Sequence, residues 1–345
     1  MAALMIKDCN TYRNSINAIA SEITVDGGRV LVTGATGLIG SCMVDVLLAA
    51  NSSFGKHFEI YAAGRNEEKL RDRFGVDEAL HFAVQDVIEP ITIENLDYII
   101  HAASNADPRS YALYPVETIN TNILGAKSVL DYCKGKHTRA LLTSTFEVYG
   151  KLDQDEYDED RYGVIDLNMI RSCYPESKRT AEMLFKSYAD EYGVDCVIAR
   201  LSSIYGPTMK ADDSKAHAQF IRKALAGENV VLKSKGSQIR TYCYVMDAVS
   251  GLLAVLFKGK AGEAYNVANE NSVASIAEVA HAIADYAGTK VVFDLPDDVE
   301  NKGFSKPQNC ILKTDKIKKL SWNGKYDLRA GVNETMSILK ESACQ

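Results

Sequence analysis

Short apolar runs alternate with amphipathic stretches along residues 29–206. Runs rich in Val, Ile, Leu and Ala predict strands at residues 29–33, 59–63, 80–84, 97–102, 139–143 and 195–201. Between these runs, apolar residues recur with helical spacing, most clearly over residues 115–133 and 175–192. Strands that alternate with helices in this way predict an α/β fold with a Rossmann-like, doubly wound parallel sheet.

The pattern loosens after Gly206 and Pro207, where shorter elements predict a smaller C-terminal α/β substrate lobe. We expect helices near residues 216–226, 247–257 and 275–287 and an extended stretch at 239–244. The first 25 residues are polar and helix-prone. The predicted organisation is therefore a helical extension at 1–28, a dinucleotide-binding domain at 29–206 and a substrate-binding lobe at 207–345, with segments free to interleave.

Charge and composition narrow the classes of partner. With 345 residues the chain has room for two domains, and its 39 Lys and Arg against 46 Asp and Glu give a net charge of −7. Lys and Arg never run beyond two in a row, so the long-range field repels nucleic acid and anionic lipid, and we expect neither as a partner. An anionic ligand must therefore be bound locally.

The sequence also bears on location and metals. Near the N-terminus, Lys7, Asp8 and Arg13 stand where a signal peptide needs an apolar core, and nothing approaches an apolar membrane span. The eight cysteines are scattered without a C-x-x-C pair or a histidine at metal-ligand spacing. We expect a reduced, cytoplasmic protein without a structural zinc.

A glycine-rich turn follows the first predicted strand. Gly34-Ala-Thr-Gly37-Leu-Ile-Gly40 opens a helical segment, where glycines permit a sharp turn and a close approach of the backbone to a pyrophosphate. The exposed N–H groups and the helix dipole favour an anion there. In this context the motif predicts dinucleotide binding rather than an ordinary strand-to-helix turn, with contacts from Gly34, Thr36, Gly37, Leu38, Ile39 and Gly40.

The cofactor is expected to be NAD, with NADP left open. The second predicted strand ends in Arg65 and lacks the acidic residue that holds the ribose 2′-hydroxyl in NAD sites. Arg65 suits a 2′-phosphate or the adenine ring, or is a plain surface arginine. Asp86, followed by Val87, is placed to accept from the adenine amino group or to cap the next turn.

Tyr174 and Lys178 are four residues apart, so they share one face of a helix. An ammonium group there lowers the pKa of a phenol from about 10 toward neutrality, making a base that takes a hydroxyl proton while a hydride leaves for a nicotinamide. Two other Tyr–Lys pairs with this spacing are interrupted by glycine. Thr145 follows the strand at 139–143, where α/β sheets place ligands, so Thr145, Tyr174 and Lys178 are the candidate catalytic set.

Two longer segments resemble the extended short-chain dehydrogenase/reductase family that acts on nucleotide sugars, and within it most closely the UDP-glucuronate decarboxylases. Ser144-Thr-Phe-Glu-Val-Tyr-Gly150 is similar to the decarboxylase pattern Ser-Thr-Ser-Glu-Val-Tyr-Gly. Arg171-Ser-Cys-Tyr-Pro-Glu-Ser-Lys-Arg179 is similar to Arg-Ser-Cys-Tyr-x-Glu-x-Lys-Arg. The resemblance implies a nucleotide-sugar substrate, a homodimer built on helices 115–133 and 175–192, and cofactor contacts from Ala102, Ala103, Ser104 and Asn122.

The same resemblance implies chemistry at C4 of the sugar. Tyr174 would take the proton of the C4 hydroxyl, Thr145 would hold its oxygen, and Lys178 would keep Tyr174 ionised and bind the nicotinamide ribose. Glu147 would manage water or a proton at C5. A 4-keto group lies β to a C5 carboxylate, which then leaves readily as carbon dioxide. The leading hypothesis is an NAD-dependent enzyme resembling UDP-glucuronate decarboxylase.

Departures from the family pattern keep other reactions open. Phe146 stands beside Glu147 where 4,6-dehydratases carry an Asp-Glu pair, and a phenyl ring cannot donate a proton to a leaving hydroxyl. Ser203 replaces an Asn that contacts the substrate in many relatives. Arg240 resembles an Arg that contacts the substrate's phosphates or its carboxylate. The alternative for Arg240 is a surface arginine on an edge strand. A 4-epimerase, a 4,6-dehydratase, an NADPH-consuming 4-keto reductase and a non-enzymatic dinucleotide sensor remain alternatives.

Overall fold

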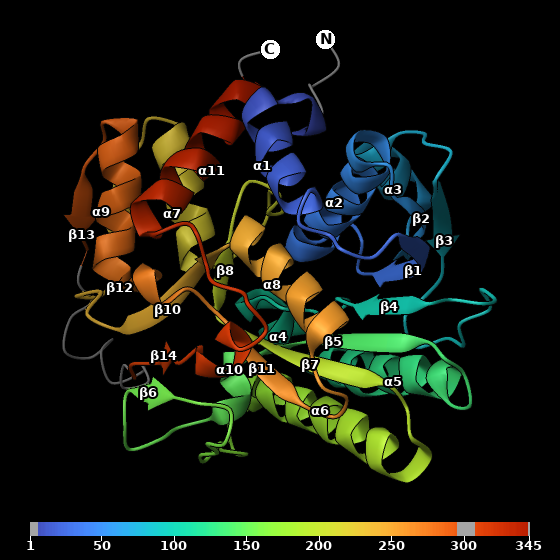
Figure 1. Cartoon of the computed structure of the whole chain (residues 1–345). Coiled ribbons are helices and arrows are strands. Elements are labelled where there is room, and N and C mark those ends of the chain that lie inside the picture. Colours follow the sequence, from blue (N-terminus) through green and yellow to red (C-terminus); the bar gives the residue numbers. More distant parts are fainter. Residues whose placement is uncertain (1–5, 295–307, 344–345) are drawn as a thin grey trace.

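The structure is a computed structural model that describes residues 6–294 and 308–343. A parallel sheet of seven strands forms its centre (Figure 1). Every pairing in the sheet is parallel, and the strand order is β11-β7-β5-β4-β1-β2-β3. The order reverses direction between β1 and β4, which is where doubly wound sheets bind ligands. The strands are β1 (Gly27–Thr33), β2 (His57–Gly64), β3 (Leu80–Val84), β4 (Tyr98–His101), β5 (Arg139–Thr145), β7 (Cys196–Leu201) and β11 (Ala264–Val267).

Helices cover both faces of this sheet, which confirms the predicted fold class. In Figure 1, α5 and α6 lie below the sheet, and α2 and α8 lie above it. Successive residues of β1 are buried on opposite faces of the sheet. Leu31 packs in the core between the sheet and helices α5 and α6, while Val30 and Val32 pack in the core on the other face. The helices are α2 (Leu38–Phe54), α3 (Glu67–Phe74), α4 (Pro108–Leu113), α5 (Pro115–Cys133), α6 (Cys173–Tyr192) and α8 (Val245–Lys258).

Most of the chain after residue 206 forms the smaller lobe at the left of Figure 1. Its sheet has the order β12-β10-β8, and α7, α9 and α11 pack around it. Two segments return to the main sheet, because β11 pairs with β7 and α8 packs on β5 and β7. The lobe contains β8 (Ser203–Tyr205), α7 (Ala216–Leu225), β9 (Val230–Leu232), β10 (Ile239–Tyr244), β12 (Val273–Ser275), α9 (Ile276–Ala287), β13 (Val291–Phe293) and α11 (Leu328–Ala343).

Short elements complete the described chain. Two-residue strands β6 (Glu156–Tyr157) and β14 (Ile311–Leu312) pair in parallel below the lobe. Single turns of 3-10 helix lie at η1 (Ile6–Asp8), η2 (Phe146–Tyr149), η3 (Ile170–Ser172) and η4 (Glu270–Ser272), and α10 (Asp315–Lys318) follows β14. Two of these turns, η2 and η3, flank the candidate catalytic residues. In the described ranges no helix is both long and apolar enough to cross a membrane.

The N-terminal helix α1 (Asn10–Ala20) packs on α2, α8 and α11. Its buried Tyr12 donates to Asp45 of α2 at 2.7 Å, and Asp45 also pairs with Arg73. Ser15 donates to Glu334 of α11 at 2.5 Å. The helix predicted in the polar N-terminal extension is therefore present, and it joins the core through one apolar face.

Candidate active site

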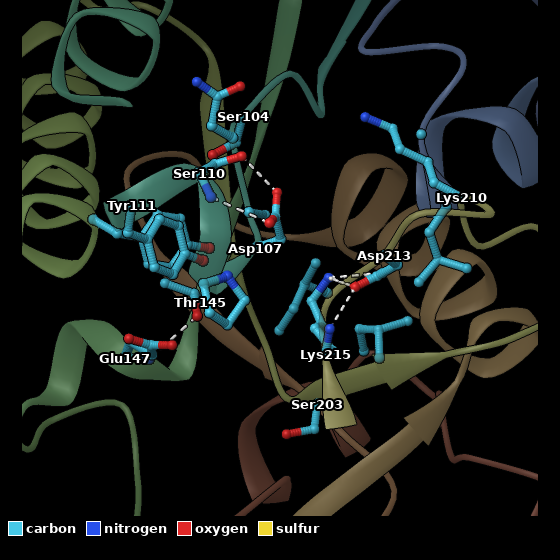
Figure 2. Close-up of a pocket in the computed structure, with 18 of the residues that line it drawn as sticks. Ser104, Asp107, Ser110, Tyr111, Thr145, Glu147, Ser203, Lys210, Asp213 and Lys215 are labelled. Atoms are coloured by element: carbon cyan, nitrogen blue, oxygen red, sulfur yellow. Dashed lines mark hydrogen bonds and ion pairs between the residues drawn. The ribbon is translucent and has the colours of Figure 1, made fainter. Parts of the chain in front are cut away.

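A cavity of about 880 Å³ opens between the carboxyl ends of the main strands and the smaller lobe. Its wall combines the glycine turn, the loop after β4, the end of β5, the start of α6 and residues 201–217. Figure 2 shows Tyr111, Thr145 and Glu147 on one side of this cavity, with Ser203, Lys210 and Lys215 on the other. The first and second parts of the chain thus both contribute side chains to one site.

The glycine turn is built as a backbone cradle. Gly34 has a φ of 65°, and a Cβ there would lie 2.8 Å from the carbonyl oxygen of Ala102. At Gly40 a Cβ would lie 2.3 Å from the carbonyl oxygen of Gly34. A second cavity of about 170 Å³ shares lining residues with the first, and it is lined by many of the residues expected to contact the cofactor: Gly34, Thr36, Gly37, Arg65, Asp86, Val87, Ala102, Ala103 and Ser104.

Arg65 and Asp86 lie together at the outer end of this second cavity. Their side chains approach to 4.0 Å, and both are well exposed. The carboxylate of Asp86 also accepts from the backbone N–H of Ile88 at 3.2 Å. The turn-capping role anticipated for Asp86 is therefore present, and both Asp86 and Arg65 also line the second cavity.

Asn122 lies behind the cavity wall rather than in it. Its side chain is buried, accepts from Ser104 at 2.8 Å and donates to Ser177 of α6 at 2.9 Å. Neither cavity is lined by Asn122. The geometry supports a positioning role, in which Asn122 fixes Ser104, a residue that does line both cavities.

Thr145 and Tyr174 both line the large cavity, with their hydroxyl groups within hydrogen-bond reach of each other. Tyr174 lies in the first turn of α6, which begins at Cys173 rather than at Pro175. The ring of Tyr111 stacks on Tyr174 with centroids 4.6 Å apart and planes 18° apart. Burial and the nearby charge of Glu147 raise the pKa of Tyr174, although the Thr145 hydroxyl works against that rise. Burial thus favours the neutral phenol over the phenolate.

Lys178 is almost fully buried, and its ammonium group points at the sheet. Its Nζ donates to the carbonyl oxygen of Thr143 at 2.9 Å. Burial lowers the pKa of Lys178 to about 8, with Glu182 acting in the opposite direction. The expected lowering of the Tyr174 pKa by Lys178 does not occur in this arrangement, because the ammonium is held on a backbone carbonyl.

Glu147 is held by an arginine that the sequence did not single out as a site residue. Arg171 of η3 donates to both carboxylate oxygens of Glu147, at 2.8 and 3.0 Å. Such a bidentate pair fixes the position and orientation of the carboxylate. Arg171 also lies over the ring of Tyr111, with its Cζ 5.8 Å from the centroid. Tyr111 and Arg171 are separated from their partners by many residues, so spacing gave no signal for them.

Arg240 and Phe146 form the opposite corner of the cavity. The guanidinium of Arg240 lies over the Phe146 ring, 5.4 Å from its centroid. One nitrogen of Arg240 donates to Gln238 at 3.3 Å, while its buried Nε has no hydrogen-bond partner among the described residues. The pair thus combines a fixed apolar platform with a cation that has donors to spare.

The smaller lobe adds charged residues that the sequence did not mark. Ser203 lines the cavity as expected, and Lys210, Asp213, Lys215 and His217 line it as well. Lys215 pairs with Asp213 at 3.0 Å, and Ser214 donates to Asp107 beside α4 at 3.0 Å. That last contact joins the lobe to the first domain beside the site.

Residues 30–268 match the model of the NAD dependent epimerase/dehydratase family. The chain belongs to this family. It is 36% identical over 307 residues to UDP-glucuronic acid decarboxylase 6 of Arabidopsis thaliana, covering 88% of this chain and 86% of that one. It is 31% identical to UDP-glucuronic acid decarboxylase 1 of Xenopus tropicalis, covering 92% and 73% respectively. The protein is accordingly an enzyme of this family, and its cofactor is NAD.

Solved structures of family members share the fold at lower identity. UDP-glucose 4-epimerase of Thermotoga maritima superimposes with a TM-score of 0.77 at 22% identity, covering 91% of this chain and 99% of that one. The dTDP-glucose 4,6-dehydratase DesIV of Streptomyces venezuelae, solved with NAD, gives 0.77 at 24%, covering 91% and 97%. The family fold thus extends over nearly the whole chain, including the smaller lobe.

Proposed function

We propose that this family member modifies a nucleotide sugar through a 4-keto intermediate, and that it is a UDP-glucuronate decarboxylase. The decarboxylase relatives support the substrate, since they match over most of both chains. The observation that carries the proposal is Arg240, which lines the cavity over the Phe146 ring and has a buried Nε without a hydrogen-bond partner among the described residues. Such a group suits a carboxylate or a phosphate.

The residues of the site divide the proton work. The Thr145 hydroxyl holds the C4 oxygen, and Tyr174 in its ionised form takes the proton from the C4 hydroxyl when the substrate is oxidised there. NAD held at the glycine turn would supply the acceptor for the hydride removed from C4 and, once reduced, the hydride donor. When the C5–C6 bond breaks, its electrons move into the C4 carbonyl, and the developing oxyanion accepts hydrogen bonds from Thr145 and protonated Tyr174. The high pKa of Tyr174 suits that donor role.

Glu147 is suited to accept rather than to donate a proton. Arg171 donates to both oxygens of its carboxylate, so Glu147 is held in place to orient the water that delivers a proton to C5. Eliminating a C6 hydroxyl needs an acid, and the neighbouring Phe146 cannot supply one. This pairing argues against a 4,6-dehydratase. A 4-epimerase needs no such acid and is the second candidate.

Product analysis separates these reactions. We expect purified protein with NAD and UDP-glucuronate to release carbon dioxide and leave a UDP-pentose, detected by mass spectrometry. UDP-glucose, dTDP-glucose and CDP-glucose serve as comparison substrates, for which loss of water or an unchanged mass with an altered NMR spectrum identifies a dehydratase or an epimerase. No turnover of UDP-glucuronate would overturn the decarboxylase assignment.

Tyr174→Phe tests the catalytic set. Removing the hydroxyl should lower kcat by about 10²–10⁴-fold and leave substrate affinity nearly unchanged, because the general acid and base is lost while the ring remains. Tyr132→Phe is a matched control, since Tyr132 also precedes a lysine by four residues but accepts from the backbone N–H of Leu96 instead. Equal losses in the two variants would show that Tyr174 has no special role.

We also propose a cytoplasmic homodimer. The outer face of α5 and α6 exposes apolar side chains, with Val116 at 68% and Met183 at 63% of their maximal area. A surface of this kind favours a helix-to-helix interface. Light scattering should give twice the chain mass, and Val116→Glu with Met183→Glu should give the monomer. A monomeric parent protein would refute the dimer.

A further inference from the structure

A buried polar network lies next to the catalytic residues, and its two charged members, Glu182 and Arg200, do not line the cavity. Ser144 precedes Thr145 on β5, so its side chain points to the other face of the strand. Its hydroxyl donates to Glu182 of α6 at 2.5 Å. Glu182 comes one helical turn after Lys178. One carboxylate therefore links the strand that carries Thr145 to the helix that carries Tyr174 and Lys178.

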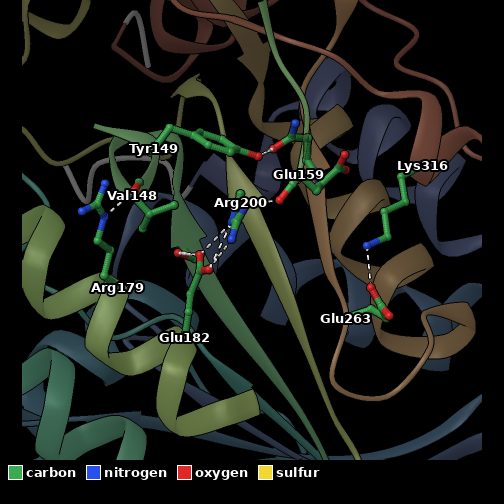
Figure 3. Close-up of polar contacts among 10 residues, drawn as sticks. Val148, Tyr149, Glu159, Arg179, Glu182, Arg200, Glu263 and Lys316 are labelled. Atoms are coloured by element: carbon green, nitrogen blue, oxygen red, sulfur yellow. Dashed lines mark hydrogen bonds and ion pairs between the residues drawn. The ribbon is translucent and has the colours of Figure 1, made fainter. Parts of the chain in front are cut away.

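Arg200 of β7 closes the network (Figure 3). It lies beside Ser144 in the sheet register, and its Nε and Nη2 reach the carboxylate of Glu182 at 3.1 and 2.8 Å. Its Nη1 donates to the carbonyl oxygen of Glu159 at 2.9 Å. Glu182 and Arg200 are 5% and 8% exposed, so both charges are removed from water and depend on each other.

Lys178 has few other charges to support it. The groups that face it are the carbonyl of Thr143 on β5, the ring of His101 on β4 and the carboxylate of Glu182 on its own helix. His101 is neutral, because burial and the charge of Lys178 lower its pKa to about 3. Glu182 is therefore the acidic group that favours the ammonium form of Lys178.

We propose that Glu182 and Arg200 are positioning residues for the active site: their buried pair fixes Thr145 against Tyr174 and Lys178, and Glu182 maintains the ammonium charge of Lys178. The pair touches neither cavity, so it acts through these three residues. The effect on turnover rests on the proposed function, whereas the effect on Lys178 does not. An ion pair that only stabilises the fold would leave the titration of Lys178 unchanged.

The test is an NMR titration of protein labelled with ¹³C in the ε-carbons of lysine, which requires no substrate. One signal should titrate well below the others and disappear in Lys178→Met. In Glu182→Gln that midpoint should fall by about one pH unit, because the supporting negative charge is gone and Arg200 is left uncompensated. Glu263→Gln breaks the ion pair with Lys316, also drawn in Figure 3, and should leave the midpoint in place.

Kinetics provide the second readout. In Glu182→Gln we expect kcat to fall by about tenfold or more with a smaller change in KM, because the reacting groups lose their alignment. The alkaline limb of the pH–kcat profile should move to lower pH together with the NMR midpoint. An unchanged midpoint in a folded Glu182→Gln protein would overturn the proposal. A parent enzyme that turns over no nucleotide sugar would overturn the proposed function alone.

Glu182→Asp covers the case in which Glu182→Gln does not fold. It keeps the charge but shortens the side chain, so the midpoint should stay closer to that of the parent protein while kcat falls. If Glu182→Asp changes neither the midpoint nor kcat, the carboxylate has no positioning role and the proposal fails.

Discussion

Two arginine–glutamate pairs flank the candidate catalytic residues, and they differ in how far water reaches them. Arg200 and Glu182 lie behind Thr145 with side chains 10% and 7% exposed. Arg171 and Glu147 lie at the cavity, 52% and 19% exposed. Both pairs make two-pronged contacts with closest distances of 2.8 Å. Nearly the same contact geometry therefore serves two environments.

The difference in exposure separates what each pair can do. A fully desolvated pair cannot open without leaving a bare charge in the protein, so it fixes the elements that carry it. A pair at a water-filled cavity costs little to open, because solvent can replace either partner. The buried pair is thus suited to hold the framework, and the cavity pair is suited to chemistry.

The largest effect should come from breaking the buried pair. Arg200→Met leaves Glu182 ionised and uncompensated, and we expect the free energy of unfolding in urea to fall by about 3–5 kcal/mol. The double variant with Glu182→Met should recover most of that loss, because no charge remains. Arg329→Met breaks a surface pair with Asp285 and should cost about 0–1 kcal/mol. Equal losses in the free energy of unfolding for Arg200→Met and Arg329→Met would show that burial of the ion pair makes no difference to stability.

The cavity pair should behave in the opposite way. Arg171→Met should lower kcat/KM by about 10²-fold, since Glu147 loses the partner that orients its carboxylate. The change in the free energy of unfolding should stay within about 1 kcal/mol. Steady-state kinetics and urea unfolding measure the two quantities. A large loss of stability with full activity would reverse the roles assigned to the two pairs.

Lys178 should give the smallest effect and the most specific one. Its folded-state pKa of about 8 lies below the unfolded value of 10.5, so the unfolded state binds the proton more tightly. Lys178 therefore lowers stability at neutral pH, and this penalty fades as the pH rises from about 8 toward 10.5. Lys178→Met should be more stable than the parent by about 1–3 kcal/mol at pH 7, with the gain shrinking at higher pH.

The exposed Lys260 provides the control for that titration. Lys260→Met should change the free energy of unfolding little anywhere in the same pH range, since its side chain is 81% exposed. Urea unfolding at several pH values measures both variants. A pH-independent difference between Lys178→Met and the parent would show that Lys178 is charged equally in both states.

Most of the fold could be predicted from the sequence, because strands and helices each have their own local spacing of apolar residues. Strand β3 and helix α5 occupy the residues predicted for them. Strand β5 runs on to Thr145, two residues beyond its predicted end, because Ser144 and Thr145 pair with Arg200 and Leu201. Strands β6, β8, β9, β11, β12, β13 and β14 escaped prediction, since they contain two to four residues and owe their pairing to distant segments.

In the candidate site, too, local features could be predicted from the sequence and contacts between distant residues could not. The glycine turn and the Tyr174–Lys178 spacing are local, and both could be recognised in the sequence. The stacking of Tyr111 on Tyr174 joins residues far apart in the chain, and so does the ion pair between Arg171 and Glu147. The direction of the Lys178 ammonium was equally hidden, because it depends on which carbonyl of β5 lies nearest.

The contact between α1 and α11 has a consequence for biosynthesis. Ser15 and Glu334 are 319 positions apart, yet one hydroxyl joins them. At about 5–20 residues per second, a ribosome needs roughly 15–60 s to make the second partner after the first. During that time the apolar face of α1, including Ile16 and Ile19, lacks its final covering. Until α11 is made, the apolar face of α1 is therefore a segment of the nascent chain for chaperones to shield.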